Sequence, residues 1–393
     1  MIQSASLFTY ELDDPTVALA EIQSQLSEKL ALKEHTVGIL MCDPEFIETG
    51  VYRHLCENLP FPVAGATTMS QAVNGEGGIL MLTLFVMTSD DVFFEAGMTA
   101  PIEAGGGNIP EAMGAAYVKA AAGLPEAPRL AIVFPPLFVE NAGDQYVEVF
   151  ETLCPNMPVF GTIAIDDTTT FDTCFTMCGG EVSRDRLSFI LLAGAVSPRF
   201  LVTALSDDNA LPYAGEITRS EGHIVHEING QSAYDYFAGL GMAKDGRLDE
   251  GLQFVPFLLD FKKRFDYDGV PVVRAMVCFD ERGAGICRGY MYENAVFTLT
   301  NPTPENIMSD SADLVEKINA LPDRQAVILF SCMVRRMTFG TEPMREIDML
   351  LEKMDPAVPF MMAYAGGEIC PTSAGENAVT NRFHNYSMIA CIL

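Results

Sequence analysis

The chain has 393 residues, of which 49% are hydrophobic, and its 24 basic and 53 acidic residues give a formal net charge of −29. No basic cluster offsets this charge, so it excludes nucleic acid as an expected partner and disfavours an anionic membrane surface. No apolar run approaches the ~18 residues of a spanning helix, and we expect no membrane insertion. The first residues lack a secretory signal, which predicts a cytoplasmic protein. Its ten cysteines without a Cys-x-x-Cys pair fit reduced thiols.

Three stretches of the chain repeat one order of predicted elements. Each begins with a short apolar run, at residues 37–41, 130–134 and 326–330. A polar loop, an amphipathic segment and a proline-led run follow, the last at residues 62–68, 158–164 and 359–365. Another apolar run closes each stretch, at residues 79–87, 187–192 and 387–393. Continuous apolar runs with helix-length spacers are typical of buried strands, so the sequence predicts an α/β fold with mixed sheets and repeated β-α-β-β units.

Capping residues mark the predicted helix starts. Asp14-Pro15 and Asp43-Pro44 each combine an N-cap with a first-turn proline. Thr303-Pro304 has the same form, while Ser232 and Thr341 are further N-cap candidates. We therefore expect a helix to begin at each of these five positions.

The middle of the chain changes character near Leu211. Residues 216–230 alternate apolar and polar side chains, which predicts a strand pair that turns at Glu221-Gly222. Residues 272–279 and the run that begins at Ala284 predict an antiparallel hairpin. We place a domain boundary here, with one domain at residues 1–205 and a second at residues 206–393.

Several motifs of the second half resemble one known family when taken in order. They are residues 217–230, Glu293-Asn-Ala-Val-Phe297, Phe330-Ser-Cys-Met-Val-Arg335, Tyr364-x-Gly-Gly-Glu368 and Phe383-His-Asn-Tyr-Ser387. This series is similar to the C-terminal domain of the FIST family, named for F-box and intracellular signal-transduction proteins. Residues 62–68 and the Asp13-Asp-Pro15 segment resemble the FIST N-terminal domain. The resemblance covers nearly the whole chain.

The resemblance implies an intracellular sensory protein that binds a small ligand, such as an amino acid. No kinase, cyclase, chemotaxis-receptor or F-box segment accompanies these motifs, so a separate signalling protein is the expected partner. The family's first-half turn often reads Gly-x-x-Thr-x-Gly-Glu, whereas residues 65–70 lack the acidic residue here. A ligand site in the first half that depends on this carboxylate is therefore not expected.

The candidate ligand-binding residues cluster in the third repeat. Glu368 follows Gly366-Gly367, where a missing Cβ lets backbone N–H groups approach a ligand, and its carboxylate suits a ligand ammonium. Arg335 follows a predicted strand end and suits a ligand carboxylate. The full predicted set is Ser331, Cys332, Arg335, Tyr364, Gly366, Gly367, Glu368 and Asn385.

Two alternative functions are compatible with the sequence: one uses residues of this candidate site as catalytic groups, and the other needs no ligand-binding residues. In the first, Cys332 is a nucleophile and His384 its base, in an enzyme for acyl or amidino transfer. In the second, the chain is an interaction scaffold without a ligand. His223 and His226 are three residues apart in a predicted strand and so lie on opposite faces; we expect neither a metal nor a cofactor.

Overall fold

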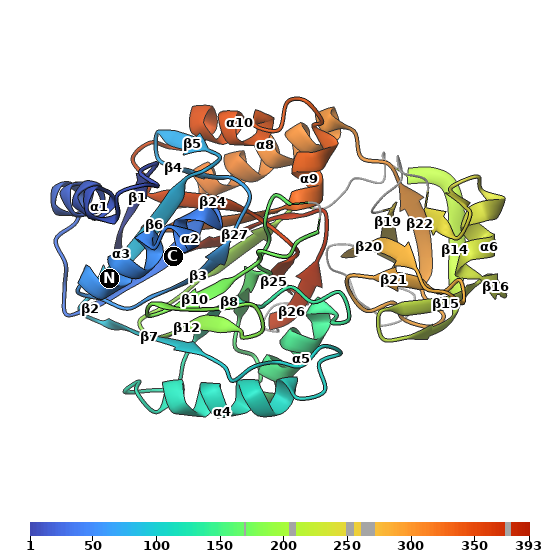
Figure 1. The fold of residues 1–393 in the computed structure, drawn as a ribbon, viewed down its shortest axis with the longest axis horizontal. Helices are drawn as coiled ribbons and strands as arrows, with labels where there is room; N and C mark the ends of the chain where they lie inside the picture. Colours follow the sequence, from blue (N-terminus) through green and yellow to red (C-terminus); the bar gives the residue numbers. More distant parts are fainter. Residues whose placement is uncertain (169, 204–209, 249–254, 261–271, 374–378) are drawn as a thin grey trace.

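The computed structural model describes residues 1–168, 170–203, 210–248, 255–260, 272–373 and 379–393. Within these residues it is a mixed α/β structure with three six-stranded sheets, one seven-stranded sheet and a two-stranded sheet. Figure 1 shows the three six-stranded sheets together in one body, with the seven-stranded sheet beside it. The predicted α/β class with mixed sheets is confirmed.

The first sheet is built around the predicted apolar runs at residues 37–41 and 62–68. Its strand order is β1 (Gln3–Thr9), β6 (Leu82–Ser89), β2 (His35–Cys42), β3 (Val63–Thr67), β10 (Thr176–Cys178) and β11 (Glu181–Ser183). Strands β2 and β3 are parallel, and β6 is antiparallel to β2. Two short helices connect β2 to β3, α2 (Glu45–Glu48) and α3 (Val51–Asn58).

The other two six-stranded sheets have the same kind of centre. The second sheet has the order β26 (Val379–His384), β25 (Glu368–Ser373), β9 (Val159–Thr162), β8 (Leu130–Phe134), β12 (Ser188–Gly194) and β7 (Val92–Met98). The third has the order β13 (Arg199–Val202), β27 (Met388–Ile392), β23 (Val327–Cys332), β24 (Phe360–Ala365), β4 (Gln71–Val73) and β5 (Glu76–Gly78). Again β8–β9 and β23–β24 are parallel, whereas β12 and β27 run antiparallel to their neighbours β8 and β23.

Each of these sheets ends in a hairpin from a different part of the chain. Hairpin β4–β5 joins β24, hairpin β10–β11 joins β3, and hairpin β25–β26 joins β9. The second and third sheets therefore pair strands from both sides of the proposed boundary at residues 205 and 206, whereas all strands of the first sheet lie before it. That two-domain division, and the superposition of the three repeated units, stay predictions.

The seven-stranded sheet closes on itself. Its order is β14 (Ala210–Glu221), β22 (Val296–Thr300), β19 (Val255–Asp260), β20 (Val272–Phe279), β21 (Gly285–Cys287), β15 (Ile224–Ile228) and β16 (Gln231–Ser232), and β14 also pairs with β15. We call this closed sheet the barrel. Helix α6 (Ala233–Gly239) packs against β15, and the two-stranded sheet is β17 (Ala243–Lys244) with β18 (Arg247–Leu248). The rings of Phe237, Phe257 and Phe297 pack edge to face in the barrel core.

The remaining helices lie around the six-stranded sheets. They are α1 (Pro15–Lys29), α4 (Ile109–Ala121), α5 (Gly143–Leu153), α8 (Pro304–Ala320), α9 (Met333–Thr338) and α10 (Arg345–Lys353). Figure 1 shows α8, α9 and α10 along one side of the body and α4 and α5 along the opposite side. None of the helices in the described part of the chain is both long and apolar enough to cross a membrane.

Three predicted helix caps are confirmed and two are wrong. Asp14, Ser232 and Thr303 each accept a backbone hydrogen bond at a helix start. Asp43 does not cap its helix, because its carboxylate accepts a hydrogen bond from the Met81 backbone instead. Thr341 does not cap either, since α10 begins only at Arg345 after a turn. The strand pair that turns at Glu221-Gly222 and the hairpin after residue 272 are both present.

Candidate functional site

The loops that leave the parallel strands of the three six-stranded sheets meet at one place. Backbone hydrogen bonds join them in pairs: Ile165 N donates to Thr67 O at 3.2 Å, Gly366 N to Ile163 O at 3.0 Å, and Tyr364 N to Ser70 O at 3.1 Å. The C-terminal ends of the parallel strands therefore converge, which is where α/β sheets place ligands.

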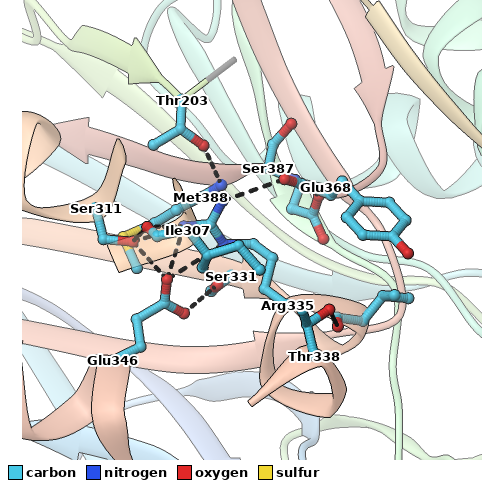
Figure 2. A network of polar contacts seen from close by, with 12 residues as sticks. Thr203, Ile307, Ser311, Ser331, Arg335, Thr338, Glu346, Glu368, Ser387 and Met388 are labelled. Atoms are coloured by element: carbon cyan, nitrogen blue, oxygen red, sulfur yellow. Dashed lines mark hydrogen bonds and ion pairs between the residues drawn. The ribbon is translucent and has the colours of Figure 1, made fainter. Parts of the chain in front are cut away.

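A buried ion pair lies behind the end of β23. Arg335 and Glu346 are both fully buried, and Nη2 of Arg335 is 2.7 Å from Oε1 of Glu346. Figure 2 shows the network around this pair, in which the hydroxyls of Ser311 and Ser331 also donate to the Glu346 carboxylate at 2.6 and 2.7 Å. A buried arginine needs such partners because an unpaired charge in the interior is costly.

Three predicted ligand residues, Arg335, Ser331 and Tyr364, lie in or beside this network. Besides Glu346, the Arg335 guanidinium donates to the carbonyl oxygens of Ile307 and Tyr386. Ser331 is occupied by Glu346, and burial next to that carboxylate raises the pKa of the Tyr364 hydroxyl well above its usual range. Arg335 thus forms its ion pair with a protein carboxylate, that of Glu346 on α10.

Glu368 begins β25 and is fully buried. Its Oε2 accepts from the Ser387 backbone N–H at 3.4 Å, and the Cys332 side chain also hydrogen-bonds the carboxyl. Oε1 has no hydrogen-bond partner among the described residues. Burial raises the pKa of this carboxyl well above its usual range, so the interior favours its protonated form.

The turn before Glu368 has the conformation that its glycines predict. Gly367 has a φ of +147°, and a Cβ there would lie 2.5 Å from the Phe383 ring. Gly366 borders a small cavity on the other side of the turn. The two glycines therefore carry the chain sharply from β24 into β25, where Glu368 does not line the cavity itself but hydrogen-bonds the side chain of Cys332, which does.

The cavity lies between the body and the barrel. Its walls are mostly apolar, from Leu137, Ile165, Phe171, Ala275, Met333 and Val334, and its polar groups come from Cys332, Asn385, Arg288 and the backbone of Gly366. Its volume is about 20 Å³, close to the space that one water molecule needs. A larger ligand therefore requires the walls to separate.

Polar contacts hold the barrel against the body next to this cavity. Arg274 of β20 is buried and forms an ion pair with Asp144 of α5, with 2.9 Å between Nη2 and Oδ1. The Asp144 Oδ2 accepts from the Tyr290 backbone, and the Asn385 Oδ1 accepts from the Ala275 backbone at 3.3 Å. We call this set of contacts the seam.

The geometry gives no support to a Cys332 and His384 pair. Burial, and then the Glu368 carboxylate, raise the pKa of the Cys332 thiol well above its usual range. His384 has its Nε2 3.1 Å from the Cys370 carbonyl oxygen, and burial lowers its pKa to about 3. The imidazole is therefore neutral and directed at the backbone, while the Cys332 thiol hydrogen-bonds the Glu368 carboxyl instead.

Sequence reasoning missed the residues that the fold contributes from distant segments. From the sequence alone, Glu346 looks like a solvent-exposed helix residue. Arg274 and Arg288 are isolated arginines in predicted strand segments and belong to no motif. The buried side of an amphipathic helix was the only signal that could have found Glu346. No group of three or more His, Cys, Asp or Glu side chains in the described ranges could hold a metal ion.

Comparisons with known proteins identify two family domains. The profile of the FIST N domain matches residues 36–231, and that of the FIST C domain matches residues 232–371. A search of curated proteins finds no significant match. Among solved structures, the cyanuic acid hydrolase from A. caulinodans is similar over 59% of this chain and 84% of that chain, with 12% identity and a TM-score of 0.27. A score this low carries no argument about this chain.

Proposed function

Because the chain belongs to the FIST family, whose domains are recognised as sensory domains of signal transduction, we propose that it is a cytoplasmic sensor that binds a small polar ligand. The ligand class includes amino acids, and a separate signalling protein carries the response. The proposed site is the cavity bordered by Cys332, Gly366 and Asn385, together with Glu368, which hydrogen-bonds Cys332.

One observation carries this proposal. Glu368 is fully buried, yet its Oε1 has no partner among the residues that the structure describes. A buried polar atom without a hydrogen bond is costly, and such atoms are rare in folded proteins. A polar ligand group that enters beside Cys332 would supply the missing partner.

The position of the cavity also suits a sensor. Its walls come from both the body and the barrel, so separation at the seam enlarges it and withdraws Val273 and Ala275 of β20 from the core that they share with the body. A ligand that occupies the enlarged space changes the spacing between barrel and body. That change of spacing is a signal that a partner protein can recognise.

A melting experiment with a panel of amino acids and small carboxylates tests the proposal. A ligand at ~100 times its Kd that binds only the folded state adds about 2.7 kcal/mol of stability. Glu368→Gln should weaken a ligand that presents an ammonium to Oε1 on the order of thirtyfold, or ~2 kcal/mol, because the ammonium would hold the Glu368 carboxyl ionised and this charge-assisted hydrogen bond is lost.

Cys332→Ser is the matched variant, and it should leave the affinity nearly unchanged. Turnover of a bound ligand that depends on Cys332 would establish the cysteine enzyme instead. Silence of the whole panel at millimolar concentration, in melting and in calorimetry, would contradict the sensor and favour the scaffold.

A further inference from the structure

We propose that Arg288 of the barrel binds an anionic group of the ligand in the seam cavity, and that the ligand is therefore a small carboxylate. This inference rests on the proposed function and adds the charge of the ligand and the residue that recognises it. Arg288 comes directly after β21 and borders the cavity together with Cys332 and Asn385.

Arg288 differs from Arg274 and Arg335, two fully buried arginines near the site. Arg274 is paired with Asp144 at 2.9 Å and Arg335 with Glu346 at 2.7 Å. The Arg288 guanidinium makes only a long 3.4 Å hydrogen bond to the carbonyl oxygen of Phe138, and it forms no ion pair within the described chain.

The surroundings of Arg288 leave its charge uncompensated. Burial lowers the pKa of its guanidinium; the neighbouring Cys278 and Cys174 side chains oppose this effect, as does the exposed Glu140 carboxylate, which forms no ion pair with Arg288. A guanidinium in a largely apolar cavity is stabilised by an anion that it can bind through two parallel hydrogen bonds. A carboxylate fits this geometry and charge.

The body provides a second donor across the cavity. Because the Asn385 Oδ1 accepts from the Ala275 backbone, its NH2 group is left to donate to a ligand. A carboxylate between Arg288 and Asn385 would therefore connect the barrel to the body.

The Arg288 backbone is already part of the seam. Its carbonyl accepts from the N–H of Gly143 in α5 of the body at 3.2 Å, while its N–H donates within the barrel to the Ala275 carbonyl at 3.0 Å. An anion bound at the Arg288 guanidinium would consequently contact a residue whose backbone connects the barrel to the body.

Formate and formamide are the probes that test this inference, because they have nearly the same shape and differ in charge. Ligand-observed NMR of the full chain should show formate bound at least tenfold more tightly than formamide. Arg288→Gln should weaken formate at least tenfold, whereas Arg288→Lys should retain part of the affinity because it keeps the charge. Arg282→Gln, on the exposed tip of the same hairpin, is the matched control and should change nothing.

Equal binding of formate and formamide, no binding of formate, or full affinity in Arg288→Gln would each overturn the inference. None of these results decides the sensor proposal, because that proposal is tested by the melting panel, whose amino acids also carry an ammonium and a side chain that formate lacks. Should Arg288→Gln fail to fold, the comparison of the two probes on the unmodified chain and on Arg288→Lys decides the matter.

Discussion

Loss of the Glu346 charge should destabilise the protein strongly. The carboxylate accepts hydrogen bonds from Nε and Nη2 of Arg335 at 3.2 and 2.7 Å, and from the hydroxyls of Ser311 and Ser331 at 2.6 and 2.7 Å. Glu346→Gln keeps the shape of the side chain but leaves the Arg335 charge in the interior without compensation. Breaking a buried pair in this way costs about 3–5 kcal/mol.

Urea unfolding followed by far-UV circular dichroism measures this cost, since the chain contains no tryptophan. Glu342→Gln removes an exposed carboxylate that lies 3.5 Å from Arg345, and it should cost less than about 1 kcal/mol. The double variant Arg335→Met with Glu346→Leu should recover most of the loss, because apolar replacement of a whole pair is often neutral. A Glu346→Gln variant that loses less than about 1 kcal/mol would refute this account of the network.

Two further predictions follow from buried ionisable groups. Burial raises the pKa of Asp43 from 3.8 to about 7, so the contribution of its carboxyl to folding stability is complete below pH ~4 and is lost as the pH rises through about 7. Over this pH range, urea titrations should show that Asp43→Asn loses less stability than the unmodified protein, by up to roughly 4 kcal/mol. Equal losses in the two proteins would contradict the raised pKa of Asp43. Iodoacetamide at pH 8 should modify the exposed Cys278 in the folded protein and spare Cys332, whose thiol is buried and has a raised pKa. Peptide mass spectrometry reads both sites, and rapid labelling of Cys332 would contradict the placement of its thiol.

The sequence predicted the strands well because burial on both faces leaves a continuous apolar run. Residues 37–41, 130–134 and 326–330 all lie in central strands, and each pairs in parallel with the proline-led run that follows. The carboxylate of Glu368 was also found, since two glycines before it mark a tight turn. These features depend on local side-chain patterns.

Features that depend on distant pairing could not be predicted. The exchange of hairpins between sheets, such as β4 beside β24, leaves no local pattern because any edge strand can accept a hairpin. The partner of Arg335 is Glu346, on a helix whose buried face was expected to be only apolar. Arg288 acquires its place at the cavity only when the barrel packs on the body.

The proposal that the seam cavity binds a small ligand is tested most directly by filling the cavity. Ala275 is buried in its wall, and Ala275→Met would occupy the space that a ligand needs. Native mass spectrometry of the purified protein, with analysis of small molecules released on denaturation, should find a ligand in the unmodified chain and none in a folded Ala275→Met variant. The same small molecule in both proteins, or none in either after incubation with the amino acid and carboxylate panel, would contradict the account.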